Sequence, residues 1–286
     1  MQPTCVRHLA DCQYTQINPN VLPKTGGTIL GIVGGAMLRS EQKFSAPLPE
    51  QVAFWNQWNA EFREQMIDRV SIDQGNLVAR WLQQLGRKDL DILEVGCGAG
   101  WLCDRLRAYG AVTATDLSHE VLKRAAARSP EVKFVAGDFM LLDFQPQAYD
   151  VIVSLEVLSH VADQPAFITK LASLLRPGGY LMLATQNRPQ LERNDIPRPR
   201  PGQIRQWVDR HELARLLKGE FDVMELRSIT PQCNRGILRV VNSRKLHTQL
   251  ANLGLGWASR LVTSTQEEAW LGWTLMCLAR KPATQA

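Results

Sequence analysis

Short runs rich in β-branched residues alternate with helical segments through the middle of the chain, and this alternation limits the possible folds most. The runs predict strands over 90–95, 111–115, 132–136, 149–154 and 180–185. Helical periodicity occupies gaps between them, at 100–109, 118–128 and 165–175. Strands joined by helical crossovers lie parallel, with helices on both faces of the sheet. The pattern therefore predicts an α/β fold.

Further elements are expected on both sides of this core. Apolar residues at three- and four-residue steps predict two helices within 48–85, and further helices are expected near 208–217 and 246–261. Strands are expected near 221–229 and 271–279. Pro177-Gly178-Gly179 predicts a turn, and the prolines between Pro189 and Pro201 predict an extended loop.

The ends of the chain and its length set the domain organisation. The 286 residues, 45% of them apolar, suffice for one large domain with additions. Residues 1–45 contain turn formers without sustained periodicity, which predicts a flexible or weakly packed extension, with Met37 as a second candidate for the native start. The apolar stretch 26–38 is too short to span a membrane and too far from the start for a secretory signal. A cytoplasmic protein is expected.

Charge and cysteine usage exclude little. The net charge is +5, and Lys and Arg are spread along the chain. A basic face would favour anionic substrates or lipid surfaces, but this distribution favours an ordinary solvated surface. The six cysteines include no Cys-x-x-Cys pair, so the sequence predicts neither a metal site nor a redox centre. Unpaired thiols fit a reducing compartment.

A glycine-rich turn follows the first strand of the alternating region. Gly96, Cys97, Gly98, Ala99 and Gly100 lead from that strand into a helix. Glycines permit positive φ and let a ligand approach the backbone, while a helix N-terminus offers unpaired N–H groups. The turn therefore predicts a site for a small, polar cofactor.

Two acidic residues at the ends of the next strands point to a nucleoside. Asp116 lies twenty residues beyond Gly96, where a carboxylate can bind both hydroxyls of a ribose. Asp138 and Phe139 follow the third strand, where an acid can accept from an exocyclic amine and a ring can pack on a base. Trp101 replaces the third glycine of the dinucleotide fingerprint, which argues against NAD.

Four motifs together resemble those of class I S-adenosylmethionine-dependent methyltransferases in order and spacing. They are Glu94 to Gly100, Asp116, Gly137-Asp138-Phe139 and Leu175-Arg176-Pro177-Gly178-Gly179. The resemblance covers roughly residues 50–280. It implies a Rossmann-like three-layer sandwich with a seven-stranded, mostly parallel sheet, in which the segment 271–279 is the one antiparallel strand.

The resemblance also implies S-adenosyl-L-methionine as the cofactor and assigns residues to it. Gly96, Gly98 and Gly100 would line the methionine part, and Glu94 would order the loop. Asp116 would hold the ribose, and Asp138 with Phe139 the adenine. Cys97, Leu117 and Leu155 complete the expected cofactor site.

The same comparison divides residues 46–286 into parts of the methyltransferase domain. Residues 46–86 would form a helical lid, 87–185 the cofactor-binding core, and 186–286 the substrate loops and final strands. Trp55, Trp58 and Phe62 share one face of the first helix, and core packing explains their spacing as well as a lid does.

The segment 149–161 looks like the corresponding region of ubiquinone-pathway O-methyltransferases. It lacks the Asn/Asp/Ser-Pro-Pro-aromatic motif usual in enzymes that methylate base amines, so a small-molecule acceptor, methylated at oxygen, is expected and a nucleic acid is not. The acceptor could be anionic, because Arg193, Arg198, Arg200 and Arg205 lie in or beside the proline-rich segment. A solvated loop is the favoured interpretation of these arginines.

Two residues after the fourth strand are candidates for a general base. His160 is the leading candidate, since an imidazole titrates near neutrality, and Glu156 is the next. A structural hydrogen bond is the alternative for both. Two alternative functions stay open: a non-catalytic protein that binds the cofactor, and a nicotinamide-dependent oxidoreductase.

Overall fold

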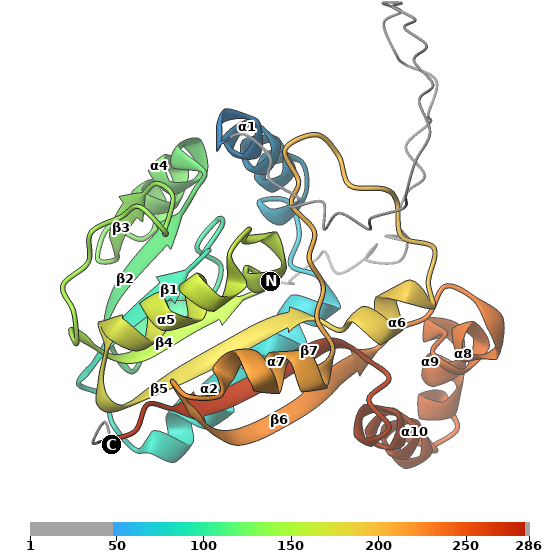
Figure 1. Ribbon diagram of the computed structural model, residues 1–286. Coiled ribbons are helices and arrows are strands. Elements are labelled where there is room, and N and C mark those ends of the chain that lie inside the picture. Colours follow the sequence, from blue (N-terminus) through green and yellow to red (C-terminus); the bar gives the residue numbers. More distant parts are fainter. Residues whose placement is uncertain (1–47, 284–286) are drawn as a thin grey trace, which may run out of the picture. The chain divides into compact units, whose positions relative to one another are not determined.

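The computed structural model describes residues 48–283 (Figure 1). The predicted extension over 1–45 and the alternative start at Met37 lie outside these residues. Within them, no helix combines the length and the apolarity needed to cross a membrane.

Seven strands form a single sheet with the order β3-β2-β1-β4-β5-β7-β6. Their bounds are β1 Leu90–Val95, β2 Gly110–Asp116, β3 Lys133–Ala136, β4 Tyr149–Leu155, β5 Leu175–Gln186, β6 Asp222–Pro231 and β7 Gly272–Arg280. Strands β1 to β5 pair in parallel, whereas β7 lies antiparallel to both β5 and β6. The predicted mostly parallel sheet, with one antiparallel strand at 271–279, is confirmed.

Helices cover both faces of the sheet, as Figure 1 shows with α5 and α7 in front and α2 behind. The bounds are α1 Leu48–Trp58, α2 Arg69–Leu85, α3 Cys103–Arg107, α4 His119–Arg128, α5 Gln164–Leu174, α6 Arg188–Glu192, α7 Arg210–Leu217, α8 Gly236–Val241, α9 Arg244–Asn252 and α10 Gly256–Glu268. A π-helical turn, Asn59–Arg63, follows α1, and a 3-10 turn, Leu158–His160, follows β4. Trp81 and Leu106 are buried on one face of the sheet and Phe167 and Leu213 on the other. These two apolar layers hold the strand ends that carry the site.

Local sequence signals explain where the longer helices begin and end. The Asp68 side chain accepts a hydrogen bond from the Ser71 N–H (2.8 Å) and starts α2, which ends at Gly86 with φ of 65°. Asp209 and Glu212 form a capping box at the start of α7. Such caps satisfy N–H groups that have no partner inside the helix.

The structure corrects three local predictions. Pro177-Gly178-Gly179 is not a separate turn but an irregular part of β5, where the register with β4 shifts and Gly178 has a φ of 78°. The proline-rich segment begins with the short helix α6, because a proline fits the first turn of a helix. The expected helix at 246–261 is two helices, α9 and α10, which are interrupted at Gly254 with φ of 74°.

The buried Lys281 at the end of β7 ties the sheet to α5. Its ammonium donates to the carbonyl oxygens of Ala172 (2.7 Å) and Leu175 (2.9 Å) at the C-terminus of that helix. Lys281→Met should lower the free energy of unfolding by about 1–3 kcal/mol, since it leaves both carbonyls without this donor. Urea denaturation measures the loss, and Lys218→Met, on the exposed end of α7, is the control. Equal stability of Lys281→Met and the parent chain would show that the contact contributes nothing.

Candidate active site

The glycine loop takes the backbone conformation that its composition predicts. Gly96, Gly98 and Gly100 have φ values of 75°, 52° and 73°, in the region that favours glycine. The N–H groups of Gly96 and Cys97 both donate to the Thr115 carbonyl, at 2.8 and 3.1 Å, which fixes the loop against the end of β2. A Cβ at position 96 would lie 2.1 Å from Val157 Cγ2, so there is no room for a side chain.

The predicted ribose ligand, Asp116, lies at the end of β2 and contacts this loop directly. Its Oδ2 accepts from the Gly98 N–H and its Oδ1 from the Ser118 N–H, both at 2.8 Å. Burial raises the pKa of Asp116, and the two N–H groups oppose that shift. Each oxygen keeps a second lone pair for a ligand hydroxyl. Leu117, next to it, is half-buried.

Glu94 lies beneath the loop in a closed, apolar environment. Burial raises the pKa of its carboxyl group well above the usual range, and its Oε2 accepts from the Cys103 thiol at 3.1 Å. Cys97 is buried beside it. Among the described residues this thiol is the hydrogen-bond partner of the Glu94 side chain, so ordering of the loop by Glu94 stays a prediction.

The adenine residues predicted after β3 occupy different environments. Asp138 Oδ1 accepts from the Met140 N–H at 2.9 Å, which leaves its other oxygen for a ligand. The Phe139 ring is 8% exposed and packs edge-on against Phe167, with centroids 5.4 Å apart. Lys170 lies 5.1 Å from the same ring. Phe139 is thus mainly a core residue, and its contact with a base stays a prediction.

The π-helical turn after α1 places two residues at the loop that sequence reasoning missed. A Cβ at Gly98 would meet Asn59 Oδ1 at 2.9 Å, and that buried oxygen has no hydrogen-bond partner within the described residues. Arg63 lies next to it, with its guanidinium carbon 5.2 Å from the Trp58 ring and 6.0 Å from the Trp101 ring. A free acceptor and a cation beside the glycine loop match the ammonium and carboxylate groups of an amino acid, so these residues fit S-adenosylmethionine.

Glu156 follows β4 in a left-handed backbone conformation, with φ of 63°. Its Oε1 accepts from the Thr274 hydroxyl at 2.9 Å and from the Gln74 amide, which come from β7 and α2. Burial raises the pKa of Glu156 to about 7. Its Oε2 has no hydrogen-bond partner among the described side chains and backbone groups. A non-glycine residue at positive φ whose carboxyl group titrates near neutrality is typical of a functional site.

His160 lies one turn further on and links two loops. Its Nδ1 is 2.7 Å from the Ile204 carbonyl, so Nδ1 carries the proton and Nε2 is left as an acceptor. Burial lowers the pKa of His160 to about 4. The imidazole is therefore neutral at physiological pH and a weak base. Both the catalytic and the structural interpretations of His160 stay open.

Helix α1 contacts the loop after β4, and both interpretations of this helix, lid and core packing, stay predictions. The Trp55 ring packs edge-on against the His160 ring at 4.7 Å, and Trp58 packs against Trp55 at 5.7 Å. Phe62 lies in the π-helical turn after α1 and is 42% exposed, whereas Phe54 is the buried residue of α1. The aromatic residues of α1 thus border the candidate site.

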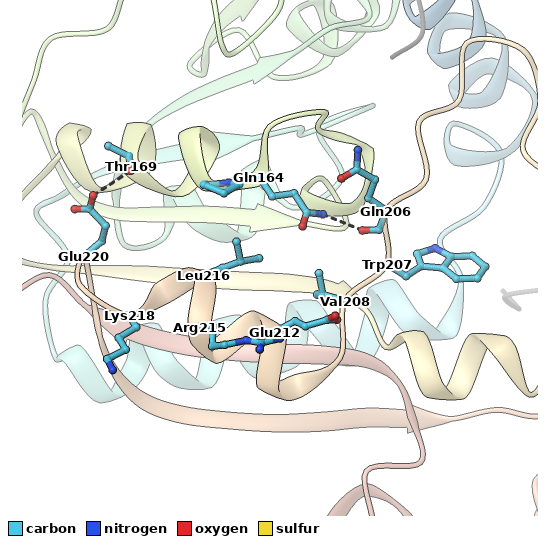
Figure 2. Close-up of a pocket in the computed structure, with 11 residues that line it drawn as sticks. Gln164, Thr169, Gln206, Trp207, Val208, Glu212, Arg215, Leu216, Lys218 and Glu220 are labelled. Atoms are coloured by element: carbon cyan, nitrogen blue, oxygen red, sulfur yellow. Dashed lines mark hydrogen bonds between the residues drawn. The ribbon is translucent and has the colours of Figure 1, made fainter. Parts of the chain in front are cut away.

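Figure 2 shows a groove between α5 and α7. Two of its residues reach the 3-10 turn that carries His160: Gln164 donates to the Leu158 carbonyl at 3.0 Å, and the Gln206 N–H donates to the Ser159 carbonyl at 2.8 Å. Its volume is about 580 Å³, and Gln164, Trp207, Arg215 and Lys218 contribute to its lining. The dashed hydrogen bonds join Gln164 to the Gln206 carbonyl (2.9 Å) and Thr169 to Glu220 (3.0 Å). None of the residues predicted for cofactor binding or catalysis lines this groove.

The chain is similar in sequence to known methyltransferases. The sequence profile of the methyltransferase domain family matches residues 62–220, more than half of the chain. Proteins named ubiquinone biosynthesis O-methyltransferase are similar. Identity is 36% over 106 residues for Parvibaculum lavamentivorans, 35% over 138 for Xanthomonas euvesicatoria and 29% over 174 for Coxiella burnetii. These matches cover 35%, 46% and 49% of this chain and 42%, 56% and 74% of those proteins, so two of them span less than two thirds of the relative.

Solved structures share the fold. The N-methyltransferase NodS from Bradyrhizobium japonicum, crystallised with S-adenosyl-L-homocysteine, aligns with a TM-score of 0.55 at 16% identity, over 82% of this chain and 99% of NodS. The [4+2]-cyclase SpnF aligns with a TM-score of 0.50 at 18% identity, over 72% of this chain and 80% of SpnF. The profile match over more than half of the chain, together with the glycine loop and the Asp116 that contacts it, assigns this chain to the class I S-adenosylmethionine-dependent methyltransferase family.

Proposed function

We propose that this protein transfers a methyl group from S-adenosylmethionine to an oxygen atom of a small-molecule acceptor. The observation that carries the proposal is the Glu156 carboxyl group, which has a pKa of about 7, an unpaired oxygen, and a place in the chain next to Val157, the residue that packs on Gly96. The names of the similar O-methyltransferases support the choice of oxygen. The nicotinamide alternative has no support from the family match.

The chain's own residues would hold the cofactor in three places. Asp116 binds the ribose hydroxyls, and Asp138 the adenine amine. Asn59 Oδ1 accepts from the amino group of the methionine part, and Arg63 pairs with its carboxylate. When bound, the sulfonium supplies an already activated methyl group, so the protein needs mainly to orient the acceptor and exclude water.

Glu156 is better suited than His160 to remove a proton from the acceptor. A base is most useful when its pKa lies near the working pH, and Glu156 meets this condition whereas His160, with a pKa of about 4, does not. The Gln74 and Thr274 donors hold one carboxylate oxygen and leave the other for the acceptor hydroxyl. His160 then has a positioning role, because its Nδ1 holds the backbone at Ile204.

An acceptor screen tests the proposal. Catechols, hydroquinones, other phenols, amines and sugars are incubated separately with the protein and S-adenosylmethionine, and release of S-adenosylhomocysteine is measured. Turnover confined to hydroxyl-bearing aromatic compounds would support it. Turnover of amines alone would contradict the oxygen assignment, and tight cofactor binding without turnover in any pool would favour the non-catalytic alternative.

We also propose that the acceptor is anionic, and two exposed arginines of the proline-rich segment would recognise it. Arg205 donates to the Pro197 carbonyl and to Gln203 and so shapes this segment, whereas Arg198 and Arg200 are exposed. The double variant Arg198→Ala/Arg200→Ala should raise KM for a carboxylated phenol by about tenfold and leave kcat unchanged, because it removes uniform binding. The uncharged phenol is the control. An unchanged KM for the carboxylated acceptor would exclude this role.

A further inference from the structure

A helical insertion, residues 236–268, separates β6 from β7 and comprises α8, α9 and α10. Figure 1 shows these helices gathered beyond the ends of the two strands, outside both helical layers of the sheet. The base of the insertion is anchored to β6: the Ser228 hydroxyl donates to the Glu267 carbonyl at 2.8 Å, and the Thr230 N–H donates to Glu267 Oε1 at 3.1 Å. The insertion is therefore a fixed projection of the domain.

Polar contacts, not an apolar core, join the three helices. None of the described side chains of α8 and α9 is buried, and the buried residue of α10 is Gln266. His247 contacts the Val241 carbonyl through Nε2 (3.0 Å) and the Ser259 hydroxyl through Nδ1, and Asn242 donates to Gln266 Oε1 at 3.0 Å. The apolar side chains of the insertion thus remain available to a partner.

These apolar side chains are large and strongly exposed. Ile237 and Val240 lie three positions apart on α8, and Trp257 and Leu261 lie four positions apart on α10, so each pair shares a helix face. Exposed fractions are 79% for Ile237, 58% for Trp257 and 59% for Leu261. Leu253, between α9 and α10, is exposed as well. Pairs of large, strongly exposed apolar side chains on one helix face are typical of an interaction surface.

The charge of the same segment selects the partner. The insertion contains four basic residues, Arg239, Arg244, Lys245 and Arg260, and two acidic ones, Glu267 and Glu268. Its formal net charge is therefore +2, and both acidic residues lie at the end of α10 that leads into β7. Arg235 pairs with Asp195, whereas Arg239 and Arg260 form no ion pair within the described residues.

We propose that the helical insertion docks on the surface of a membrane that contains anionic phospholipids. Trp257, Leu261 and Ile237 would enter the interface, while Arg239 and Arg260 would meet the lipid phosphates. A second copy of the chain fits less well, because two cationic faces would repel each other and charged residues are depleted in protein interface cores. The inference concerns binding alone and does not depend on the proposed methyl transfer.

Vesicle flotation with the full chain tests the proposal. Binding is expected to vesicles of phosphatidylcholine with about 30% phosphatidylglycerol, to be absent for phosphatidylcholine alone, and to weaken as salt rises from about 0.1 M to about 1 M. The pairs Trp257→Ser/Leu261→Ser and Arg239→Glu/Arg260→Glu should each reduce the partition coefficient by roughly tenfold or more. Thermal melts check that each double variant is folded. Because one double variant removes apolar side chains and the other reverses charges, the second still tests the proposal if the first fails to fold.

Matched controls replace residues of the same kind elsewhere on the surface. Leu141→Ser removes another strongly exposed apolar side chain (76% exposed), and Lys88→Glu/Lys123→Glu changes the net charge as the arginine pair does. Both should bind vesicles as the parent chain does. The proposal is overturned if anionic and neutral vesicles bind equally, if neither binds, or if the controls lose as much binding. It is also overturned if the insertion variants abolish self-association and leave vesicle binding intact, which would assign the face to a second copy.

Discussion

Glu156→Gln is expected to lower kcat by about 10²- to 10⁴-fold and to leave the dissociation constant for S-adenosylhomocysteine nearly unchanged. Glutamine has the same shape and can still accept from Gln74 and Thr274, but it cannot take a proton. In the parent chain, kcat should rise with pH through about 7, because the carboxylate is the active form. Steady-state kinetics across this range measure both effects, and the variant should lack the transition.

Although Glu156→Gln should lower kcat, it should raise the free energy of unfolding at alkaline pH. The pKa of Glu156 is raised to about 7 in the fold, so the unfolded chain releases the proton at lower pH than the folded chain does. This contribution to stability is present below the unfolded pKa, is lost as pH rises through about 7, and amounts to up to about 3 kcal/mol. Glu156→Gln should therefore be more stable than the parent chain at about pH 8, where the parent carries the buried charge.

Glu220→Gln is the control for both measurements, since it removes a carboxylate bonded to Thr169 beside α5, away from the site. It should alter neither kcat nor the pH profile. If Glu156→Gln kept the kcat and the pH transition of the parent chain, Glu156 would not be the base, and His160 would return as the candidate.

Asp116→Asn is expected to weaken binding of S-adenosylhomocysteine by roughly 100-fold. The Asp116 carboxylate accepts from Gly98 and Ser118 and has capacity left for the ribose, whereas an amide nitrogen would face one of these N–H groups as a second donor. Charge-assisted hydrogen bonds of this kind contribute about 1.5–3 kcal/mol each. Asp116→Asn should thus weaken two contacts at once: the hydrogen bond from the glycine loop to residue 116, and the hydrogen bonds from the ribose hydroxyls to it. Isothermal titration calorimetry measures the affinity.

Asp143→Asn, at an exposed carboxyl group after β3, is the matched control and should bind the cofactor product normally. Unchanged affinity of Asp116→Asn would rule out the ribose assignment. Loss of binding by both variants would point to a general electrostatic effect instead of a specific contact.

The shared fold does not by itself determine the reaction, since the cyclase SpnF has it too. What separates the possible activities is the set of side chains at the carboxyl ends of the strands. In this chain Glu156, Gln74 and Thr274 form that set, together with Asn59 and Arg63 from the turn after α1. Comparison of the positions of Glu156, Gln74 and Thr274 is therefore more informative about the acceptor chemistry than the overall fold, whereas Asn59 and Arg63 concern the cofactor.

The sequence by itself determined the architecture and the cofactor loop, because both depend on local physics. Alternating apolar periods predicted the strand and helix order, and the glycines of the loop occupy the positive-φ conformations that their composition predicts. Asp116 was likewise placed correctly at the end of the second strand. The predicted turn at Pro177 to Gly179 was wrong, because pairing with β4 kept that segment within β5.

Only the tertiary structure decided which side chains meet. Gln74 lies 82 residues before Glu156 in sequence and Thr274 lies 118 after it, and no local pattern relates them. Burial, which shifts the pKa of Glu156 to about 7 and that of His160 to about 4, depends on the elements packed around each group. The exposure of the apolar side chains in the insertion could not be predicted from the sequence either. Their spacing is that of ordinary helices that pack on a core, and only the tertiary structure shows that nothing in the described chain covers them.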